Sequence, residues 1–522
     1  MKQGTQPVAW WEWDDVEVPA TAVYQVAFRY ANGHSRLNRC RITVNGRRDL
    51  TNNPTPSGTP GYPFDGTYAF CKTNGWNVWR ELVIGIELQA GRNTIRVTVE
   101  NPEGAPLIDK ITVGQPWQPS SVTVLPGAHG WDRVPEILAR ISPPVFPPQD
   151  WLITDHGAKT DGVTDALPVL NQTIRACAAA GGGRVVVPTG DFCLKGTVLL
   201  ASRVNLHLAA GARLLFRGEK SDYGPRVLTT TEGNLCYKNS LIYGYGLSDV
   251  ALTGEGSTSV IDGGQAQLTW KDGKVHHYAD VGLFPEDRPL DECRPNGIDL
   301  FRCQKVLLDG YRLQNYPFWG NVLTNCTNVT VRHLDVDSHF SNNDGIDIQS
   351  CRDVLVEDCR FDTKDDCICL KAGRDRDGRE VLGPCQNVVI RRNQLATECS
   401  HLGLGSEMSG GLQQVFVDEA GVNGKVVVKA NYDRGGSVGQ VFVRDCPQIH
   451  TVVMNFENYN YRGYYDPPVY DGFSFENLTG LKVVSLKGWV DNLIRNVSFR
   501  HCGKPEVTQI YTENVDFEGT KP

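Results

Sequence analysis

The chain has 522 residues and carries 60 acidic against 52 basic side chains, which gives a net charge of −8. This balance gives no electrostatic reason to bind nucleic acid or an anionic membrane surface. Glycine occurs 54 times and proline 29 times, whereas charged residues make up only 21% of the chain, so helical bundles and coiled coils are disfavoured. No stretch approaches the ~20 consecutive apolar residues of a membrane-spanning helix.

Residues 1–115 are predicted to form an antiparallel β-sandwich. Short runs that alternate apolar and polar side chains are separated by Asn-Gly and Ala-Gly turns, which is the pattern of half-buried strands. These runs are Tyr24–Tyr30, Cys40–Val44, Leu82–Leu88 and Thr94–Val99. Prolines then cluster in residues 116–149, for example in Ile141–Pro148, which predicts a linker before a second domain at residues 150–522.

The second domain opens with a helical pattern at Ala166–Ala180 that is stopped by glycines, and short β segments follow. Three of the later segments superpose without gaps, and their reference cysteines Cys303, Cys326 and Cys351 are 23 and 25 residues apart. The segments are Ile298–Leu313, Asn321–Val336 and Ile346–Phe361. A repeat of this length with two or more β runs predicts a parallel β-helix, whose exposed end the helix would cover. A leucine-rich repeat is the competing fold, but its regularly spaced leucines are absent.

Residues at the same place in successive coils of a β-helix lie about 4.8 Å apart, so columns can be read from the sequence. The residues seven positions before the three reference cysteines are Asn296, Trp319 and Asp344, and they are predicted to form one column. The segment Asp344–Gln349 matches Asp366–Lys371, which adds Asp366 to this column. Two carboxylates would then share one face of the solenoid.

Asp365 directly precedes Asp366, so three acids converge within about two coils. Hydrolysis of a glycosidic bond needs a protonated carboxyl group and an ionised carboxylate, and crowding of like charges raises the pKa of one member. Two other interpretations remain open: the aspartates are turn residues, or they bind calcium. Trp319 is either a core residue or a stacking platform for a sugar.

Basic side chains follow the acids along the chain at His401, Lys429 and Arg434. Arginine binds a carboxylate as a fork and lysine binds it as a point charge, so these residues would suit an acidic sugar. The alternative is that they are ordinary solvated surface residues. The sixteen cysteines lack paired zinc spacing, and we expect mostly buried thiols and no bound metal.

Over roughly residues 150–515 the chain resembles the glycoside hydrolases of family 28, the polygalacturonase-like enzymes. Ile153–Gly162 looks like the opening motif of the family, and Asn343–Asp347 resembles its N-[TN]-D-G-[IF]-D motif. Asp365–Ile368, followed by Lys371, resembles its D-D-C-[IV]-x-[IL]-K motif. The expected fold is therefore all-β: a right-handed parallel β-helix (pectin-lyase-like solenoid) preceded by the antiparallel β-sandwich.

The resemblance implies an inverting hydrolase in which Asp365 is the general acid and Asp344 and Asp366 are the bases, with acid and base about 6.5–9.5 Å apart. The predicted substrate-binding residues are His401, Lys429, Arg434, Trp319, Asn296 and Lys371. Two positions depart from the family pattern. An ungapped match places Ser400 where the family has histidine, and Val427 where it has arginine; His401 and Arg434 are the candidate substitutes.

The sandwich resembles carbohydrate-binding modules of families 6 and 35, through segments such as Tyr24–Gly33 and Leu88–Ile95. Trp76 and Asn101 are its predicted sugar contacts, with a purely structural domain as the alternative. The acidic segment that binds calcium in that group has no match before Trp10.

These patterns predict an enzyme that hydrolyses galacturonic-acid-containing pectic polysaccharide or oligosaccharide, as a polygalacturonase or a rhamnogalacturonan-type hydrolase. The span from about Lys220 to Arg294 is too long for one coil and is expected to wall one end of the cleft, which favours attack at chain ends. A hydrolase of a different or neutral glycan, a non-catalytic glycan-binding solenoid and a β-helix lyase remain alternatives.

We expect no cofactor, no nucleic-acid partner and no membrane partner, and the oligomeric state stays open. Residues 1–13 lack the apolar segment of an export signal. The expected compartment is extracellular or periplasmic if a signal was removed, and cytoplasmic otherwise.

Overall fold

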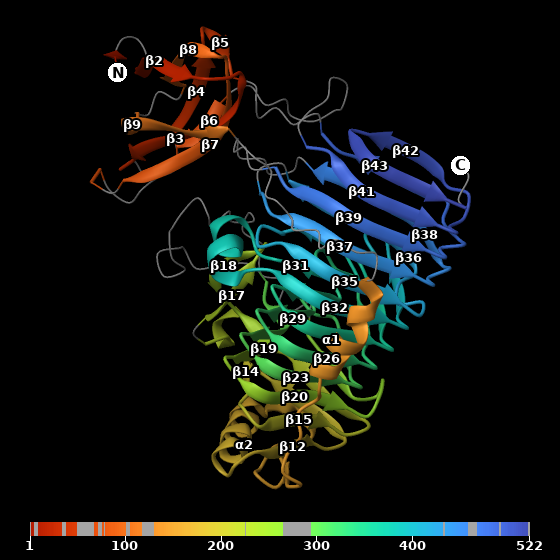
Figure 1. The fold of residues 1–522 in the computed structure, drawn as a ribbon. Coiled ribbons are helices and arrows are strands. Elements are labelled where there is room, and N and C mark those ends of the chain that lie inside the picture. Colours follow the sequence, from red (N-terminus) through yellow and green to blue (C-terminus); the bar gives the residue numbers. More distant parts are fainter. Residues whose placement is uncertain are drawn as a thin grey trace.

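The computed structural model describes residues 2–4, 9–33, 38–49, 67–70, 76–77, 79–100, 105–116, 130–224, 226–264, 294–431, 434–457, 467–489 and 492–519, and every structural statement concerns these residues. They form an antiparallel sandwich followed by a long solenoid of parallel strands (Figure 1). None of the described helices is both long and apolar enough to cross a membrane.

The sandwich consists of two antiparallel sheets. The first has the strand order β1 (Lys2–Gly4), β2 (Trp10–Val18), β8 (Gly91–Val99), β4 (Asn38–Val44) and β5 (Arg47–Arg48), with β6 (Thr67–Phe70) paired to β4. The second has the order β7 (Arg80–Leu88), β3 (Ala22–Ala31) and β9 (Leu107–Pro116). Alternate side chains of β3 and β8, such as Phe28 and Val97, are fully buried between the sheets, which is the reason for the period-two pattern in the sequence. The predicted sandwich is confirmed.

The solenoid is built from three parallel sheets. The second sheet ends at β33 (Gln394–Thr397), and the later coils add strands to the first and third sheets. The first sheet contains β10 (Asp150–Leu152), β12 (Gly183–Val187), β15 (Val204–Leu208), β20 (Ser248–Gly254), β23 (Gln304–Asp309), β26 (Thr327–Arg332), β29 (Arg352–Glu357), β32 (Cys385–Arg391), β35 (Leu412–Asp418), β37 (Ser437–Arg444), β39 (Val469–Glu476), β41 (Ile494–Arg500) and β43 (Thr512–Glu518). The second contains β11 (Asp161–Asp165), β13 (Gly190–Leu194), β16 (Ala212–Phe216), β21 (Val260–Asp262), β24 (Arg312–Gln314), β27 (Asp335–Ser338), β30 (Arg360–Thr363) and β33 (Gln394–Thr397).

The third sheet carries the candidate site and is called the site sheet below. Its strands, in order, are β14 (Val198–Leu199), β19 (Ser240–Tyr245), β22 (Asn296–Phe301), β25 (Asn321–Thr324), β28 (Ile346–Gln349), β31 (Ile368–Lys371), β34 (Leu402–Ser406), β36 (Gly424–Asn431), β38 (Ile449–Glu457), β40 (Val483–Lys487) and β42 (Glu506–Ile510). The expected parallel β-helix is confirmed.

The core of the solenoid is a set of stacked apolar columns. In the site sheet, Leu300, Leu323, Ile348, Leu370 and Leu404 are in register in five successive coils, and all are buried. Burying one such side chain contributes roughly 1.5–3 kcal/mol. No single coil can bury its own apolar face, so the stacking of coils supplies the stability.

The strands of the first sheet share a local backbone feature that fixes the shape of each coil. Their second, third or fourth residue has a positive φ in six successive coils, from Lys305 to Gln440. Asparagine and aspartate tolerate this left-handed conformation better than most residues. Asn328 (φ 54°), Asp353 (φ 57°) and Asn387 (φ 59°) occupy it in consecutive coils. The sequence repeat therefore encodes a recurrent bend as well as a repeated core.

Two helices cover parts of the solenoid. Helix α2 (Leu167–Ala179) places Leu170, Ile174 and Cys177 in the main core at the first coils, which is the end-covering role expected from the sequence. The 3-10 helix η1 (Gly130–Arg133) and helix α1 (Val134–Arg140) lie in the segment predicted as a linker, and Ile137 of α1 packs against Leu355 and Phe416 of the solenoid (Figure 1). Part of this segment is thus docked on the solenoid surface.

An antiparallel hairpin covers part of the outward face of the site sheet. Its strands are β17 (Val227–Thr231) and β18 (Asn234–Lys238), preceded by the 3-10 helix η2 (Lys220–Asp222). Thr229 Oγ1 donates to Asp299 Oδ2 at 2.7 Å, and Gln349 Nε2 donates to Thr230 Oγ1 at 2.9 Å. Leu235 packs with Phe301 and with Leu382 of the π-helical turn η5 (Asp377–Leu382).

Candidate active site

The column read from the sequence exists in the structure. Backbone hydrogen bonds connect Gly297 N to Trp319 O, Gly320 N to Asp344 O and Gly345 N to Asp366 O, at 2.8, 2.9 and 2.9 Å. Cys367 N continues the ladder to Ser400 O at 3.0 Å. Asn296, Trp319, Asp344, Asp366 and Ser400 therefore occupy equivalent places in successive coils, at the edge where the strands of the site sheet begin.

The three aspartates are close together around Asp366. Cys369 Sγ lies 3.3 Å from Asp366 Oδ2 and 3.6 Å from Asp344 Oδ2. A carboxylate oxygen of Asp344, one of Asp366 and the sulfur of Cys369 lie within 4.8 Å of one another. A second group with the same spacing consists of Asp365, Asp366 and Cys399. Asp366 belongs to both groups, whereas Asp344 and Asp365 occur in different groups. The arrangement places Asp366 between the other two acids.

Asp365 differs from its partners in exposure and in backbone setting. It is half-buried, whereas Asp344 and Asp366 are only 4% and 3% exposed. Its carbonyl oxygen accepts hydrogen bonds from Thr363 Oγ1 at 2.7 Å and Thr397 Oγ1 at 2.6 Å, and its Oδ1 accepts from the N–H of Asp366 at 2.9 Å. These bonds fix the residue at a bend before β31, so that its side chain does not simply alternate with that of Asp366.

Lys429 keeps Asp366 ionised. Burial opposes ionisation of this carboxyl group, but the Lys429 ammonium, 3.0 Å from Oδ2, and the Ser400 N–H, 2.8 Å from Oδ1, hold the pKa of Asp366 below its usual value. Gly403 leaves the space for this pair, because a Cβ there would lie 3.0 Å from Asp366 Oδ2. Lys429 is half-buried.

Asp344 has the opposite electrostatic environment. Burial and the neighbouring Asp347 carboxyl group raise the pKa of Asp344 well above its usual value, and Lys371 opposes this shift from 3.7 Å. Burial likewise raises the pKa of Asp347 to about 7. The pKa values of Asp344 and Asp366 are therefore shifted in opposite directions, so the two neighbouring acids differ in their tendency to hold a proton.

Lys371 and Arg434, both predicted to bind substrate, are part of a buried ion cluster. Lys371 Nζ donates to Glu407 Oε2 at 3.1 Å, and Arg434 Nη1 donates to Glu407 Oε1 at 2.7 Å and to Ser406 Oγ at 2.6 Å. Arg434 is fully buried and Lys371 is 5% exposed. Both side chains contact Glu407 inside the protein, and in this arrangement neither is accessible from the surface. Their substrate-binding role stays a prediction.

Trp319 and Asn296 are also covered. Trp319 is 3% exposed and stacks on Phe318, with Lys371 Nζ 4.3 Å from its ring centroid. Asn296 is fully buried, accepts a hydrogen bond from Lys238 Nζ at 3.0 Å and donates to Asp299 Oδ2 at 2.9 Å. The structure thus favours the core-packing interpretation of Trp319, and it assigns Asn296 to the network beneath the hairpin.

His401 lies at the margin of the acid group. Its ring packs over Gly424, where a Cβ would lie 2.4 Å from the imidazole, and the His450 ring is 6.4 Å away. Burial, His450 and Lys425 lower the pKa of His401 to about 4, so the ring is neutral over most of the pH range. Ser400, not His401, occupies the column of Asp366. His401 keeps its half-buried position and stays a predicted substrate contact.

The donor atoms around the acids do not suit calcium. Both three-residue groups include a cysteine sulfur, whereas Ca²⁺ takes six to eight oxygen ligands. Lys429 Nζ also occupies one side of Asp366. The calcium interpretation of the aspartates is therefore disfavoured by the chemistry of the residues present.

Sequence reasoning missed several residues of this region. Glu407 joins Lys371 to Arg434, and Asp347 lies 3.4 Å from Lys371 Nζ. Cys399 is an exposed residue whose thiol is partly covered, and this partial burial, together with Asp365 and Asp366, raises the pKa of the thiol to about 11. The position of Asp347 could have been predicted from the sequence, because it alternates with the apolar Ile346 and Ile348 and must therefore point away from the core. No repeat pattern marks Glu407 or Cys399.

A comparison with family models decides the classification of the solenoid. Residues 177–432 match the model of Glycosyl hydrolases family 28. The solenoid is a family 28 glycosyl hydrolase domain. A solved exopolygalacturonase from Thermotoga maritima is 28% identical, covers 75% of this chain and 96% of its own, and superposes with a TM-score of 0.63.

Curated relatives match the family 28 domain over part of their length. A probable polygalacturonase from Vitis vinifera is 28% identical over 63% of this chain and 68% of its own. An exo-poly-alpha-D-galacturonosidase from Dickeya chrysanthemi is 25% identical over 51% of this chain and 49% of its own.

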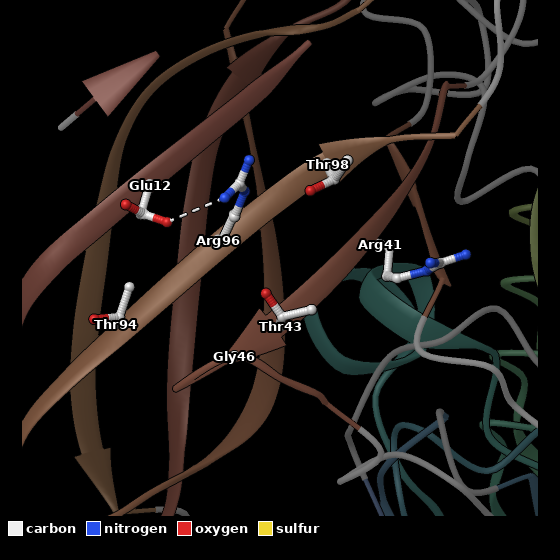
Figure 2. Close-up of a pocket in the computed structure, with 7 residues that line it drawn as sticks. All are labelled: Glu12, Arg41, Thr43, Gly46, Thr94, Arg96 and Thr98. Carbon is white, nitrogen blue, oxygen red and sulfur yellow. Dashed lines mark ion pairs between the residues drawn. The ribbon is translucent and has the colours of Figure 1, made fainter. Parts of the chain in front are cut away.

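The amino-terminal sandwich is similar to a family 35 carbohydrate-binding module from Clostridium thermocellum, with 31% identity over 20% of this chain and 68% of the module, and a TM-score of 0.16. Trp76 is 44% exposed and lies against Gly33, whereas Asn101 is outside the described residues. A hollow of about 320 Å³ lies on the outward face of β2, β8 and β4 (Figure 2). Glu12 and Arg96 form an ion pair of 3.6 Å within it.

Proposed function

We propose that the family 28 domain hydrolyses glycosidic bonds of galacturonate-containing pectic polysaccharide or oligosaccharide, acting from a chain end. The observation that carries this proposal is the convergence of Asp344, Asp365 and Asp366 around one point of the site sheet, with Lys429 bound to the central acid. The relatives described as polygalacturonases support the substrate class.

In the proposed mechanism Asp365 is the general acid, because it is the most exposed of the three and can reach a glycosidic oxygen. Its proton passes to the leaving oxygen as the bond to the anomeric carbon breaks. A water molecule held by Asp366 and Asp344 attacks the opposite face of the sugar and loses a proton to a carboxylate. The configuration at the anomeric carbon is inverted, and exchange with solvent restores the protons.

Lys429 has two proposed roles in this mechanism. It stabilises the ionised form of Asp366, and its partly exposed ammonium is available to the carboxylate of a galacturonate unit. Lysine acts on such a group as a point charge, without the bidentate geometry of arginine. Val427, two positions earlier on the same face of β36, supplies no charge.

Chain-end attack is supported by the hairpin β17–β18. It covers the outward face of the site sheet over β22, β25 and β28, where Asp299, Val322 and Asp347 are fully buried. Gly233 at the hairpin turn packs so closely on Glu407 that a Cβ would lie 2.7 Å from the Cβ of Glu407. A polysaccharide cannot pass through this region, so a chain end would have to enter from the other side.

A second candidate function is hydrolysis of a different or neutral glycan. The observation that favours it is the replacement of a carboxylate-binding arginine by Val427, together with the burial of Arg434. The two candidates differ in whether turnover depends on the uronic carboxylate.

The test is to incubate the full chain with homogalacturonan, rhamnogalacturonan and their oligomers, and to identify the first product. Early release of a mono- or disaccharide from a uronic substrate supports chain-end hydrolysis. Carboxyl-reduced versions of the same oligomers serve as matched substrates, and equal rates on both forms would favour the second candidate.

A further inference from the structure

The outward face of the site sheet is covered on one side of the acids and open on the other. Asp299, Val322 and Asp347 are in register on the covered side and fully buried. The same column continues through Cys369 and Gly403 toward the last coils. Its next members, Val427, Val453 and Ser485, are half-buried, and Thr508 in the coil after them is exposed. Access to the face therefore increases toward the last coils.

The open part, here called the open track, consists of the outward-facing positions of β36, β38 and β40. These are Lys425, Val427 and Lys429, then Thr451, Val453 and Asn455, then Val483, Ser485 and Lys487. Three of these nine are lysines and none is acidic. Two acidic residues border them: Glu457, two positions after Asn455 at the end of β38, and Glu506 in the next coil, in register with Val483. The open track is therefore cationic in a chain whose net charge is −8.

Two of the lysines are aligned along the solenoid. Lys429 is in register with Asn455, which is in register with Lys487, so Lys429 and Lys487 are two coils apart, or roughly 10 Å at strand spacing. Lys425 lies four residues before Lys429 on the same face of β36, and its Nζ is 3.5 Å from the carbonyl oxygen of Glu398. Within the described residues, neither Lys425 nor Lys487 has a carboxylate partner, whereas Lys429 is bound to Asp366.

A glycan with a carboxylate on successive sugars complements this arrangement. Valine and threonine between the lysines offer a surface for sugar rings, and each ammonium attracts a nearby uronate. The hairpin covers the opposite direction, so among the described residues the open track is the accessible path for the chain beyond the scissile bond.

We propose that the open track binds the part of an acidic glycan that extends beyond the bond to be cleaved, with Lys425 and Lys487 contacting uronate carboxylates. This inference rests on the proposed function, because it takes the acids near Lys429 as the point of cleavage. In this proposal the two lysines increase the affinity for longer glycan chains, whereas Asp365 takes part in bond cleavage.

The first experiment compares polygalacturonate with digalacturonate as substrates of the full chain. Lys487→Met is expected to raise the KM for the polymer about 2–5-fold more than the KM for the disaccharide, the scale of one exposed ion pair. Lys425→Met/Lys487→Met should enlarge this difference, and salt should reduce it through screening. Lys159→Met, which removes an exposed lysine from the first coil, is the matched control.

The second experiment separates this inference from the proposed function. The Asp365→Asn chain is run in native gels that contain polygalacturonate, so that binding is measured without turnover. Retardation that weakens when Lys487→Met is added supports the open track, even if the parent proves to be inactive on uronic glycans. Equal KM changes for both substrate lengths, or retardation that Lys487→Met leaves unchanged, would overturn it.

Discussion

Lys429 Nζ lies 3.0 Å from Asp366 Oδ2, although the two residues are 63 positions apart in the sequence. Two turns of the solenoid bring them together, one coil contributing Asp366 before β31 and another contributing Lys429 in β36. The contact determines the protonation of the central acid, because burial alone would raise its pKa.

Replacing Lys429 with methionine tests this relationship. In Lys429→Met the pKa of Asp366 should rise, because burial is then no longer offset by the ammonium, and the acid limb of kcat/KM should move to higher pH. KM for an acidic substrate should rise more than KM for a neutral one. Lys364→Met, which removes an exposed lysine paired with Glu398, is the control. If the acid limb did not move, Lys429 would not control the pKa of Asp366.

Asp365→Asn should lower turnover sharply and leave the fold intact, because the side chain keeps its size and loses only its acid. General acid catalysis contributes about 10²–10⁴-fold, so the loss in kcat should be of this order. Asp362→Asn, which alters an acid on β30 paired with Arg360, is the matched control. A variant that retained more than about a tenth of the parent rate would reject Asp365 as the acid.

Arg434→Met should destabilise the domain, because it leaves the carboxylate of Glu407 buried with one partner fewer. Breaking a buried pair from one side costs about 3–5 kcal/mol. Urea unfolding measures the change, and Glu407→Gln/Arg434→Met should recover part of it. If Arg434 contacted substrate instead, the single variant would raise KM with little effect on stability.

Asp347→Asn should change how stability depends on pH. Burial raises the pKa of Asp347 to about 7, above its value in the unfolded chain, so the unfolded state loses this proton first as the pH rises. The stabilisation is complete below about pH 4 and is lost progressively up to about pH 7. The variant should show a smaller loss of stability across that window in unfolding experiments. Parallel curves for parent and variant would contradict the assigned environment.

Much of the fold could be predicted from the sequence, because the repeat of the solenoid has a nearly constant length. Cys303, Cys326 and Cys351 mark equivalent corners, and one register then fixes the column from Asn296 to Asp366. The family motifs added the expected roles of the three acids. The sandwich strands were equally visible, because alternate residues such as Phe28 and Val97 face one core.

The exposure of outward-facing side chains could not be predicted in the same way. Lys371 and Lys429 occupy the same kind of outward position on strands two coils apart, yet only Lys429 is partly exposed. The difference arises from Glu407 and from the hairpin β17–β18, whose turn packs on Glu407. Neither belongs to the repeat, so the column pattern carried no information about burial of Lys371 or Arg434.

Asp344, Asp365 and Asp366 are proposed to cleave a uronic glycan with inversion. The most direct measurement is to follow digestion of oligogalacturonate by proton NMR with the parent and with Asp365→Asn. The parent is expected to release first a short uronic sugar whose anomeric configuration is opposite to that of the cleaved linkage, and the variant is expected to release it at least about 10²-fold more slowly. A first product with retained configuration, or equal release by Asp365→Asn, would contradict this proposal.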